Sequence, residues 1–88
     1  MYILFSQRDK KLYIGYTENL SNRLGEHFRG RVVATRNRKP IILIYYEAFT
    51  NKQDAKMRER FLKSGFGRSQ LKKALQNKLK ELGYKHLE

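Results

Sequence analysis

The sequence predicts an α/β domain of the α+β kind, in which a small three-stranded antiparallel sheet is flanked by about three helices in the order β-β-α-β-α-α. Three observations lead to this prediction. Three short runs rich in β-branched and aromatic residues have the length of strands. Apolar residues recur at helical spacing in three other segments. A chain of 88 residues has room for one core, so strands and helices must share it.

The first two strands are predicted at residues 2–6 and 11–16, separated by the short polar segment 7–10. A connection of this length favours a hairpin, in which the two strands pair antiparallel. This pairing places Tyr2 and Tyr13 on neighbouring strands.

The first helix is expected to follow these strands, with Thr17 as its N-cap. Leu20, Leu24 and Phe28 recur every four residues and predict one apolar face. Gly30 is expected to end this helix.

Residues 30–40 carry four arginines and lysines and little apolar content, which predicts a basic loop. Pro40 then opens the third strand at residues 41–46. Either Thr50 or Asn51 is predicted to cap a second helix that runs to about Lys63.

Two glycines in residues 64–68 predict a break before the last helix. Ser69 is its predicted cap, and Gly83 is its predicted C-terminal stop. The buried stripe of this helix is expected to consist of four leucines, Leu71, Leu75, Leu79 and Leu82.

The composition is strongly basic, with 20 Lys and Arg against 8 Asp and Glu, a net charge of +12 and a pI of about 10.2. The excess is present in both halves of the chain and is therefore not a basic tail. Such charge on a folded domain favours nucleic acid as the partner, above all DNA. A solubilising surface is the alternative, but a small domain usually needs a net charge of only about 2–8 for that purpose. A membrane surface is less favoured, because no predicted helix pairs a fully apolar face with this charge.

The chain contains no cysteine, so any metal ion would be bound by oxygen or histidine nitrogen. No apolar run is long enough to cross a membrane, and the N-terminus lacks the features of a signal peptide. These absences favour a cytoplasmic protein. We expect one domain over residues 1–86 and interpret Leu87-Glu88 as an expression scar.

Several residues combine a chemically useful side chain with a position near the predicted core. Arg23 and His27 lie one helical turn apart and therefore on the same side of the first helix. Arginine suits a forked grip on phosphate. His27 has three interpretations: a hydrogen-bonded boundary residue, a phosphate contact or a proton carrier. Taken singly, Tyr2 and Tyr13 are more typical of packing residues.

Glu59 borders the apolar face of the second predicted helix, where an acidic residue is unusual in so basic a chain. Its carboxylate suits Mg²⁺ or Mn²⁺, and an ion pair with a nearby Lys or Arg is the structural alternative. Arg58 lies nearer the middle of that face, and we expect it to pair with Glu47. Gly15 follows a strand and permits the close approach of another group.

Taken in order, these residues resemble the GIY-YIG nuclease domain, in particular its small stand-alone bacterial members, which are related to the nuclease domain of the excision-repair incision subunit. The second half of the family's name is literal in Tyr13-Ile14-Gly15, and Tyr2 supplies the tyrosine of the first half. Further matches are Thr17, Leu20 and Arg23 (T-x-x-L-x-x-R), Glu26-His27 and Gly30 (E-H-x-x-G), residues 38–49, and Ala55, Arg58, Glu59, Leu62 and Lys63 (A-x-x-R-E-x-x-L-K). One departure is that the asparagine found after the glutamate in many members is missing.

The resemblance implies an endonuclease that hydrolyses DNA phosphodiester bonds with one divalent ion, Mg²⁺ or Mn²⁺, held by Glu59, in the setting of DNA repair or recombination. Arg23 would clamp the phosphate, Tyr2 and Tyr13 would position or deprotonate the attacking water, and His27 would shuttle a proton or bind phosphate. Residue reasoning does not decide which tyrosine is the base, whereas the family favours Tyr2. Residues expected to contact the substrate are Gly15, Arg31, Arg36, Arg38, Lys39, Arg68, Lys72 and Lys73.

Two other classes of function compete with this reading. A non-catalytic, basic nucleic-acid-binding module of the same fold would explain the charge and the missing asparagine. It would leave the joint presence of Tyr2, Tyr13, Arg23 and Glu59 unexplained. A protein-interaction domain would show no salt-dependent affinity for DNA, in contrast to a nucleic-acid binder.

Overall fold

Strand β1 (Tyr2–Ser6) forms the centre of a three-stranded sheet in the computed structural model, which describes residues 1–84. Strands β2 (Leu12–Gly15) and β3 (Ile41–Tyr46) pair with it on either side, both antiparallel, in the order β2-β1-β3. All five residues of β1 are buried, because helices cover both faces of the sheet. The predicted fold class and the hairpin between the first two strands are confirmed. The expected expression scar at residues 87–88 lies outside the described part of the chain.

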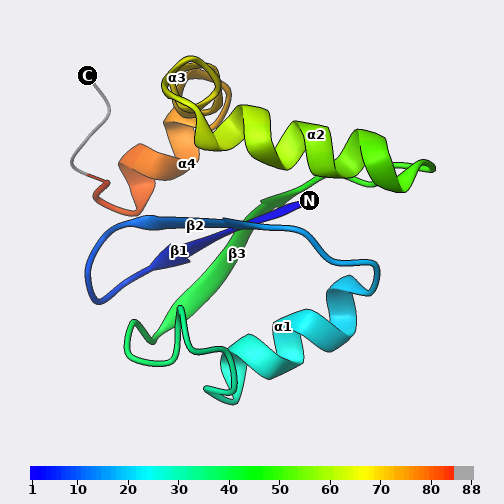
Figure 1. Cartoon of the computed structure of the whole chain (residues 1–88). Coiled ribbons are helices and arrows are strands. Elements are labelled where there is room, and N and C mark those ends of the chain that lie inside the picture. Colours follow the sequence, from blue (N-terminus) through cyan, green and yellow to red (C-terminus); the bar gives the residue numbers. More distant parts are fainter. Residues whose placement is uncertain (85–88) are drawn as a thin grey trace.

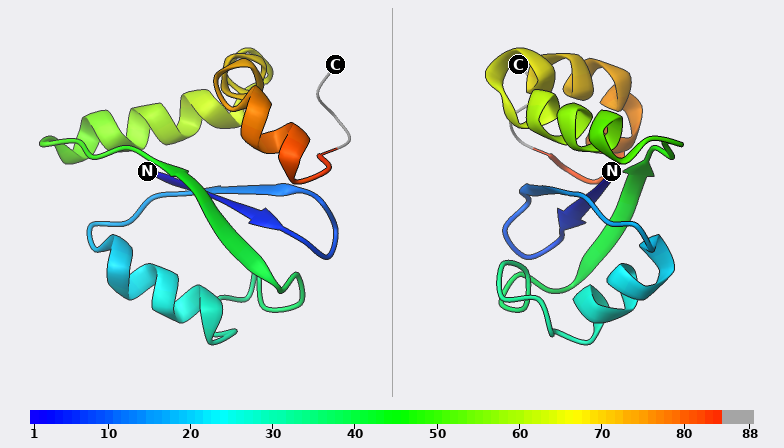
Figure 2. Two further views of the ribbon diagram at one scale, coloured as in Figure 1. Left: turned by 180° about the vertical axis from the view of Figure 1, so that it is seen from behind. Right: turned by 45° about the vertical axis from the view of Figure 1, so that its right-hand side comes forward.

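The two faces of the sheet are covered by different parts of the chain (Figures 1 and 2). Helix α1 (Leu20–Phe28) and the loop after it lie on one face. Helices α2 (Lys52–Lys63), α3 (Gly65–Ala74) and α4 (Gln76–Glu81) lie on the other. Strands β2 and β3 are the two edges of the sheet. No helix among the described residues is long and apolar enough to span a bilayer.

Side chains alternate between these two faces along β1 and β2. Ile3, Phe5, Leu12 and Ile14 join the core formed with helices α2 to α4. The opposite face carries a smaller apolar cluster, built on Tyr2, Leu4 and Ile41 with Tyr13, Leu20, Leu24 and Leu43 packed against it. The alternation therefore directs both tyrosines of the predicted hairpin toward α1.

Helix α1 differs from its prediction in two respects. Its N-cap is Asn19, whose side chain accepts a hydrogen bond from the Asn22 backbone, while Thr17 closes the turn before it. Its buried residue is His27, whereas Phe28 is 47% exposed. The helical angle of 100° per residue explains this, because residue 27 lies almost directly above Leu20 and residue 28 has rotated away from the sheet.

The break between α2 and α3 is a corner instead of a loop. Asn51, one of the two predicted caps, caps α2, but Ser64 caps α3 in place of Ser69. The two helices approach so closely at this corner that a Cβ atom on Gly67 would lie 1.9 Å from the carbonyl oxygen of Phe61. The predicted third helix is two helices separated at Leu75, which gives one helix more than expected. Of the predicted leucine stripe, Leu71 and Leu79 are buried, while Leu75 and Leu82 are partly buried against the same core. Gly83, with its positive φ of 77°, follows the C-cap of α4, as predicted.

Candidate active site

A row of three buried side chains crosses the space between the sheet and α1. The hydroxyl oxygen of Tyr2 on β1 lies 2.8 Å from Nε2 of His27 on α1. On the other side of the ring, Nδ1 of His27 lies 2.7 Å from Oγ1 of Thr35, in the loop that follows α1. All three side chains are at most 1% exposed. Both imidazole nitrogens are therefore satisfied by protein groups, as buried nitrogens require.

The histidine in this row is neutral. Burial lowers the pKa of His27, and the positive charge of Arg23 lowers it further, against a smaller opposing effect from Glu26. A neutral imidazole has one N–H donor and one acceptor, so its two hydrogen bonds run in a single direction along the row. Protonation would supply two donors, and both hydroxyl groups would then have to accept from the ring.

The phenol in the row is held in its protonated form. Burial raises the pKa of Tyr2 to about 12, although a polar interaction with Arg23 acts in the opposite direction. Tyr13 raises the pKa of Tyr2 further. The polar ends of Arg23 and Tyr13 therefore lie near the Tyr2 hydroxyl.

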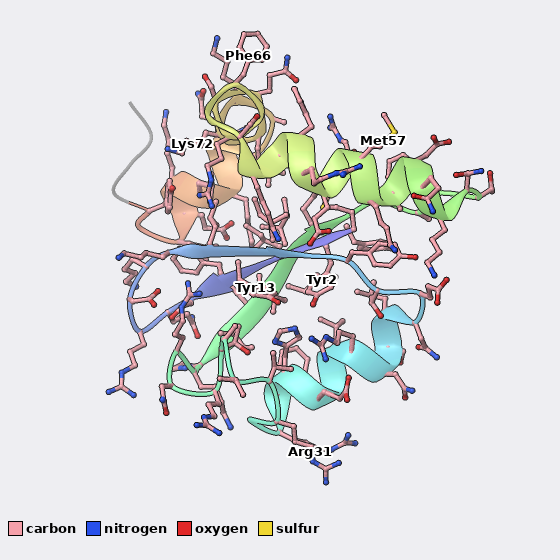
Figure 3. The ribbon with its side chains drawn as sticks, viewed as in Figure 1. Tyr2, Tyr13, Arg31, Met57, Phe66 and Lys72 are labelled. Atoms are coloured by element: carbon pink, nitrogen blue, oxygen red, sulfur yellow. The ribbon has the colours of Figure 1, made fainter. Side chains whose placement is uncertain are left out.

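Tyr13 stands at the open side of this group. Its ring centroid lies 6.2 Å from that of Tyr2 and 5.2 Å from that of His27, in tilted and edge-on arrangements. Its side chain is only half-buried because β2 is the edge strand, whereas Tyr2 on the central strand is enclosed. Figure 3 shows both tyrosines on the α1 side of β2.

Gly15 leaves the space that the Tyr2 side chain fills. It pairs with Tyr2 across the two strands, and a Cβ atom at this position would lie 2.6 Å from both Cζ and the hydroxyl oxygen of Tyr2. A side chain here would also come within 3.0 Å of the Tyr13 ring. The close approach predicted for Gly15 is thus made by Tyr2 itself, and Gly15 is buried beneath it.

Arg23 lies one turn before His27 on α1, as predicted. Its side chain is 36% exposed, and its guanidinium pairs with Glu26 at 3.3 Å. Because that pair is open to solvent, it is weak and can be exchanged for another anion. Arg23 therefore combines a position near the two tyrosines with a head group available to a phosphate.

Glu59 lies on α2, and Figure 1 shows this helix on the side of the sheet opposite to α1, toward which the two tyrosines point. The Glu59 side chain is 20% exposed, and its carboxylate pairs with Lys63 one turn later at 3.0 Å, the arrangement predicted as the structural alternative. The neighbouring Arg58 pairs with Glu47 through two hydrogen bonds of 3.0 and 3.3 Å, which confirms that expectation.

The donor set suits one kind of metal ion. Residues 1–84 contain no group of three or more His, Cys, Asp or Glu side chains that could hold an ion. A lone carboxylate fits Mg²⁺ or a similar ion, which keeps several waters and commonly takes one or two carboxylates together with substrate phosphate. It does not fit a resident ion with several protein ligands.

The expected substrate contacts are distributed over several surfaces. Arg31, Arg36 and Lys39 are exposed on the loop after α1, and Lys73 is exposed on α3. The loop itself is fixed, because Val32 and Thr35 are buried beneath it. Arg38, Arg68 and Lys72 line a separate hollow at the hairpin end of β2.

Thr35 is the member of the buried row that sequence reasoning missed. It lies in an irregular loop, where no periodicity indicates which side chains turn inward. The available signal was the pair Val32 and Thr35, two β-branched residues three apart in an otherwise polar and basic segment.

The chain is similar to known proteins over most of its length. The family model of the GIY-YIG catalytic domain matches residues 1–74. A UPF0213 protein of Clostridium perfringens is 36% identical over 78 residues, which are 88% of this chain and 84% of the relative. One from Staphylococcus haemolyticus is 36% identical over 72 residues, covering 81% and 87% of the two chains. One from Streptococcus pyogenes serotype M5 is 44% identical over 71 residues, covering 80% and 76%. No solved structure matches the chain significantly.

Proposed function

The chain belongs to the GIY-YIG family, and from this premise we propose that it is a metal-dependent endonuclease that hydrolyses DNA phosphodiester bonds. The observation that carries the proposal is the buried row of Tyr2, His27 and Thr35. A row of this kind fixes Tyr2 and His27, beside which Tyr13 and Arg23 lie. Preorganised side chains at an open strand edge are what hydrolysis of a bound phosphodiester requires.

Tyr13 is the better candidate for the residue that orients the attacking water and takes its proton. Tyr2 is 1% exposed, its hydroxyl is engaged by His27, and its pKa of about 12 keeps it protonated. A general base must come within hydrogen-bond reach of the water it deprotonates. In this assignment Tyr2 and His27 are positioning residues, and only Tyr13 meets the substrate side.

Arg23 would bind the non-bridging oxygens of the scissile phosphate. Its guanidinium keeps its charge at every physiological pH and presents a planar fork to oxyanions. Binding of a phosphate would replace the solvent-exposed pair with Glu26. Arg23 would thereby stabilise the negative charge that increases at the phosphate in the transition state.

Glu59 is the residue that would hold Mg²⁺ or Mn²⁺. Such an ion, when bound, neutralises charge on the phosphate and the leaving oxygen. The carboxylate now forms an ion pair with Lys63. The lysine would have to turn away when an ion binds, which its 50% exposed side chain permits. Tyr13 and Glu59 would then act from the two sides of edge strand β2. The likeness to the excision-repair nuclease supports DNA repair or recombination in the cytoplasm as the setting.

A non-catalytic nucleic-acid-binding module is the second candidate. The engagement of Glu59 by Lys63, together with the absence of a multi-carboxylate group within residues 1–84, favours it. The net charge of +12 serves either function.

Cleavage of supercoiled plasmid and branched DNA with Mg²⁺ or Mn²⁺ tests the proposal. We expect nicking by the wild type that Tyr13→Phe and Glu59→Ala each reduce by about a hundredfold or more. Tyr46→Phe and Glu81→Ala remove the same groups from exposed positions and should leave the rate unchanged. Metal-independent binding without cleavage by any of these proteins would favour the binding module.

A further inference from the structure

A hollow of about 650 Å³ lies at the hairpin end of β2, away from the tyrosine cluster. Four segments of the chain line it: the β1–β2 hairpin, the end of the loop after α1, helix α3, and Tyr84 after α4. Its lining residues are Asp9, Lys11, Leu12, Arg38, Arg68, Lys72 and Tyr84.

One wall of this basic hollow is held by a buried hydroxyl. Ser6, which is 2% exposed, donates to the backbone oxygen of Arg38 at 2.5 Å and accepts from the backbone N–H of Asp9 at 3.1 Å. The Asp9 carboxylate in turn accepts from Nε of Arg38 at 2.6 Å. The Arg38 guanidinium also donates to the Leu12 carbonyl at 3.4 Å. Arg38 is therefore oriented before any ligand arrives.

The other wall is helix α3, on which Arg68 and Lys72 lie one turn apart and so share a side. The tight corner at Gly67 sets the direction of this helix relative to α2. The ammonium group of Lys72 lies 5.7 Å from the centroid of the Tyr84 ring, a cation–π contact. Figure 3 shows Lys72 on the side of β2 opposite to Tyr13.

The charge of the basic hollow selects an anion. Four cationic side chains face one carboxylate, and Arg38 already engages that carboxylate. Among residues 1–84, Lys11, Arg68 and Lys72 form no ion pair. A second hollow of about 420 Å³, near the starts of α1 and α2, instead has two carboxylates, Glu18 and Glu47, and one lysine.

We propose that the basic hollow binds a phosphate of the nucleic-acid backbone that flanks the scissile one, within about three nucleotides on the same strand. This rests on the proposed function, because the scissile phosphate is placed at Tyr13. Lys11 immediately precedes edge strand β2, two residues before Tyr13, a separation of about 7 Å along extended chain. One backbone following this edge would meet both groups. The basic hollow would thus set the register of the strand without reading its sequence.

The experiment measures binding of a short fluorescein-labelled DNA duplex over a salt series, with EDTA present so that nothing is cleaved. The double variant Arg68→Gln/Lys72→Gln removes two cations from the basic hollow. Its matched control, Arg60→Gln/Lys80→Gln, removes the same two residue types from exposed positions on α2 and α4. We expect the first to lose affinity by roughly tenfold or more and to reduce the salt slope by about 1, and the control to lose less than about threefold.

A second measurement locates the phosphate. Replacing single phosphates with neutral methylphosphonates should weaken wild-type binding at one flanking position and have no effect there in Arg68→Gln/Lys72→Gln. Lys11→Gln, on the opposite wall, should reproduce the effect if the double variant is unstable. Equal losses in the two double variants, or no sensitive phosphate, would overturn the proposal. If the expected binding pattern is found but the protein cleaves no DNA, the phosphate site in the basic hollow is supported and only the proposed nuclease activity is contradicted.

Discussion

The hydroxyl of Tyr2 and Nε2 of His27 are 2.8 Å apart in a region that solvent does not reach, since the two side chains are 1% and 0% exposed. Two residues that a sequence comparison would assign to proton transfer thus form a closed, buried pair. Thr35 completes the pair on its far side. The row holds Tyr2 in place beside its more exposed neighbour Tyr13, whose ring centroid lies 6.2 Å away.

The protonation of His27 should make stability depend on pH in a defined window. The unfolded chain binds a proton at a histidine near pH 6.5, whereas the lowered pKa of folded His27 keeps it neutral. Between these two values the unfolded state binds more protons, so the free energy of unfolding falls as pH falls, by at most about 1.4 kcal/mol per pH unit. Asp9 and Glu47 also have lowered pKa values, but from 3.8 and 4.5, so their effects occur at lower pH.

Urea unfolding at a series of pH values between 7.5 and 5 (about the histidine range) measures this dependence. His27→Gln should flatten the curve, and His86→Gln, which removes the other histidine of the chain, should not. An identical pH dependence in wild type and His27→Gln would contradict a neutral, buried His27.

Thr35 should matter through the single hydrogen bond of its hydroxyl. Thr35→Val keeps the shape of the side chain but leaves Nδ1 of His27 without a partner in a buried site. The cost of such an unsatisfied group is about 1–3 kcal/mol of unfolding free energy. Thr35→Ser retains the hydroxyl and should restore most of the stability and of the DNA cleavage rate. Thr50→Val at an exposed position is the control, and a Thr35→Val protein as stable and active as the control would rule the row out as a positioning device.

Gly15 offers a test of the aromatic cluster from the other side. An alanine there would bring its Cβ to 2.6 Å from the Tyr2 hydroxyl and 3.0 Å from the Tyr13 ring, so both phenols must shift. Overpacking of this kind costs about 1–3 kcal/mol, and we expect the cleavage rate to fall more steeply than stability does. Gly65→Ala, where a Cβ meets open space at the start of α3, should be neutral or slightly stabilising. Thermal melts and nicking rates of the two variants decide the matter, since equal behaviour would show that Gly15 does not constrain the tyrosines.

Local sequence patterns predicted the elements of the fold better than the contacts between them. Period-two and period-four patterns predicted the sheet and the helices, because alternation and helical repeat are local properties. The hairpin brought Tyr2 and Tyr13 together for the same reason. The N-cap of α3 was misplaced because Ser64 and Ser69 are equally good caps, and the contact of Gly67 with Phe61 in α2 favours the first.

In the candidate site, too, local patterns predicted contacts within one element but not contacts between distant segments. The helical repeat placed Arg23 and His27 on one side of α1. The four-residue spacing that predicted Phe28 as buried drifts around the helix, however, and at 100° per residue it is His27 that faces the sheet. The contact of Thr35 with His27 spans an irregular loop of basic residues and has no local pattern. The relation of Glu59 to the tyrosines depends on which face of the sheet each helix covers, a property that spacing along the chain does not contain.

The Glu59 carboxylate, which would hold the metal ion, is only weakly paired. The Glu59–Lys63 pair is an i,i+4 pair at 3.0 Å with a half-exposed lysine, worth about 0.3–0.5 kcal/mol. Lys63→Gln should therefore strengthen binding of Mn²⁺ to the protein by only about twofold, and Glu59→Gln should abolish it. Lys78→Gln breaks a comparable pair with Glu81 on α4 and serves as the matched control. Electron paramagnetic resonance of free Mn²⁺ reads binding directly, without cleavage. If Glu59→Gln binds Mn²⁺ as the wild type does, the ion is held elsewhere and α2 has no part in the hydrolytic site.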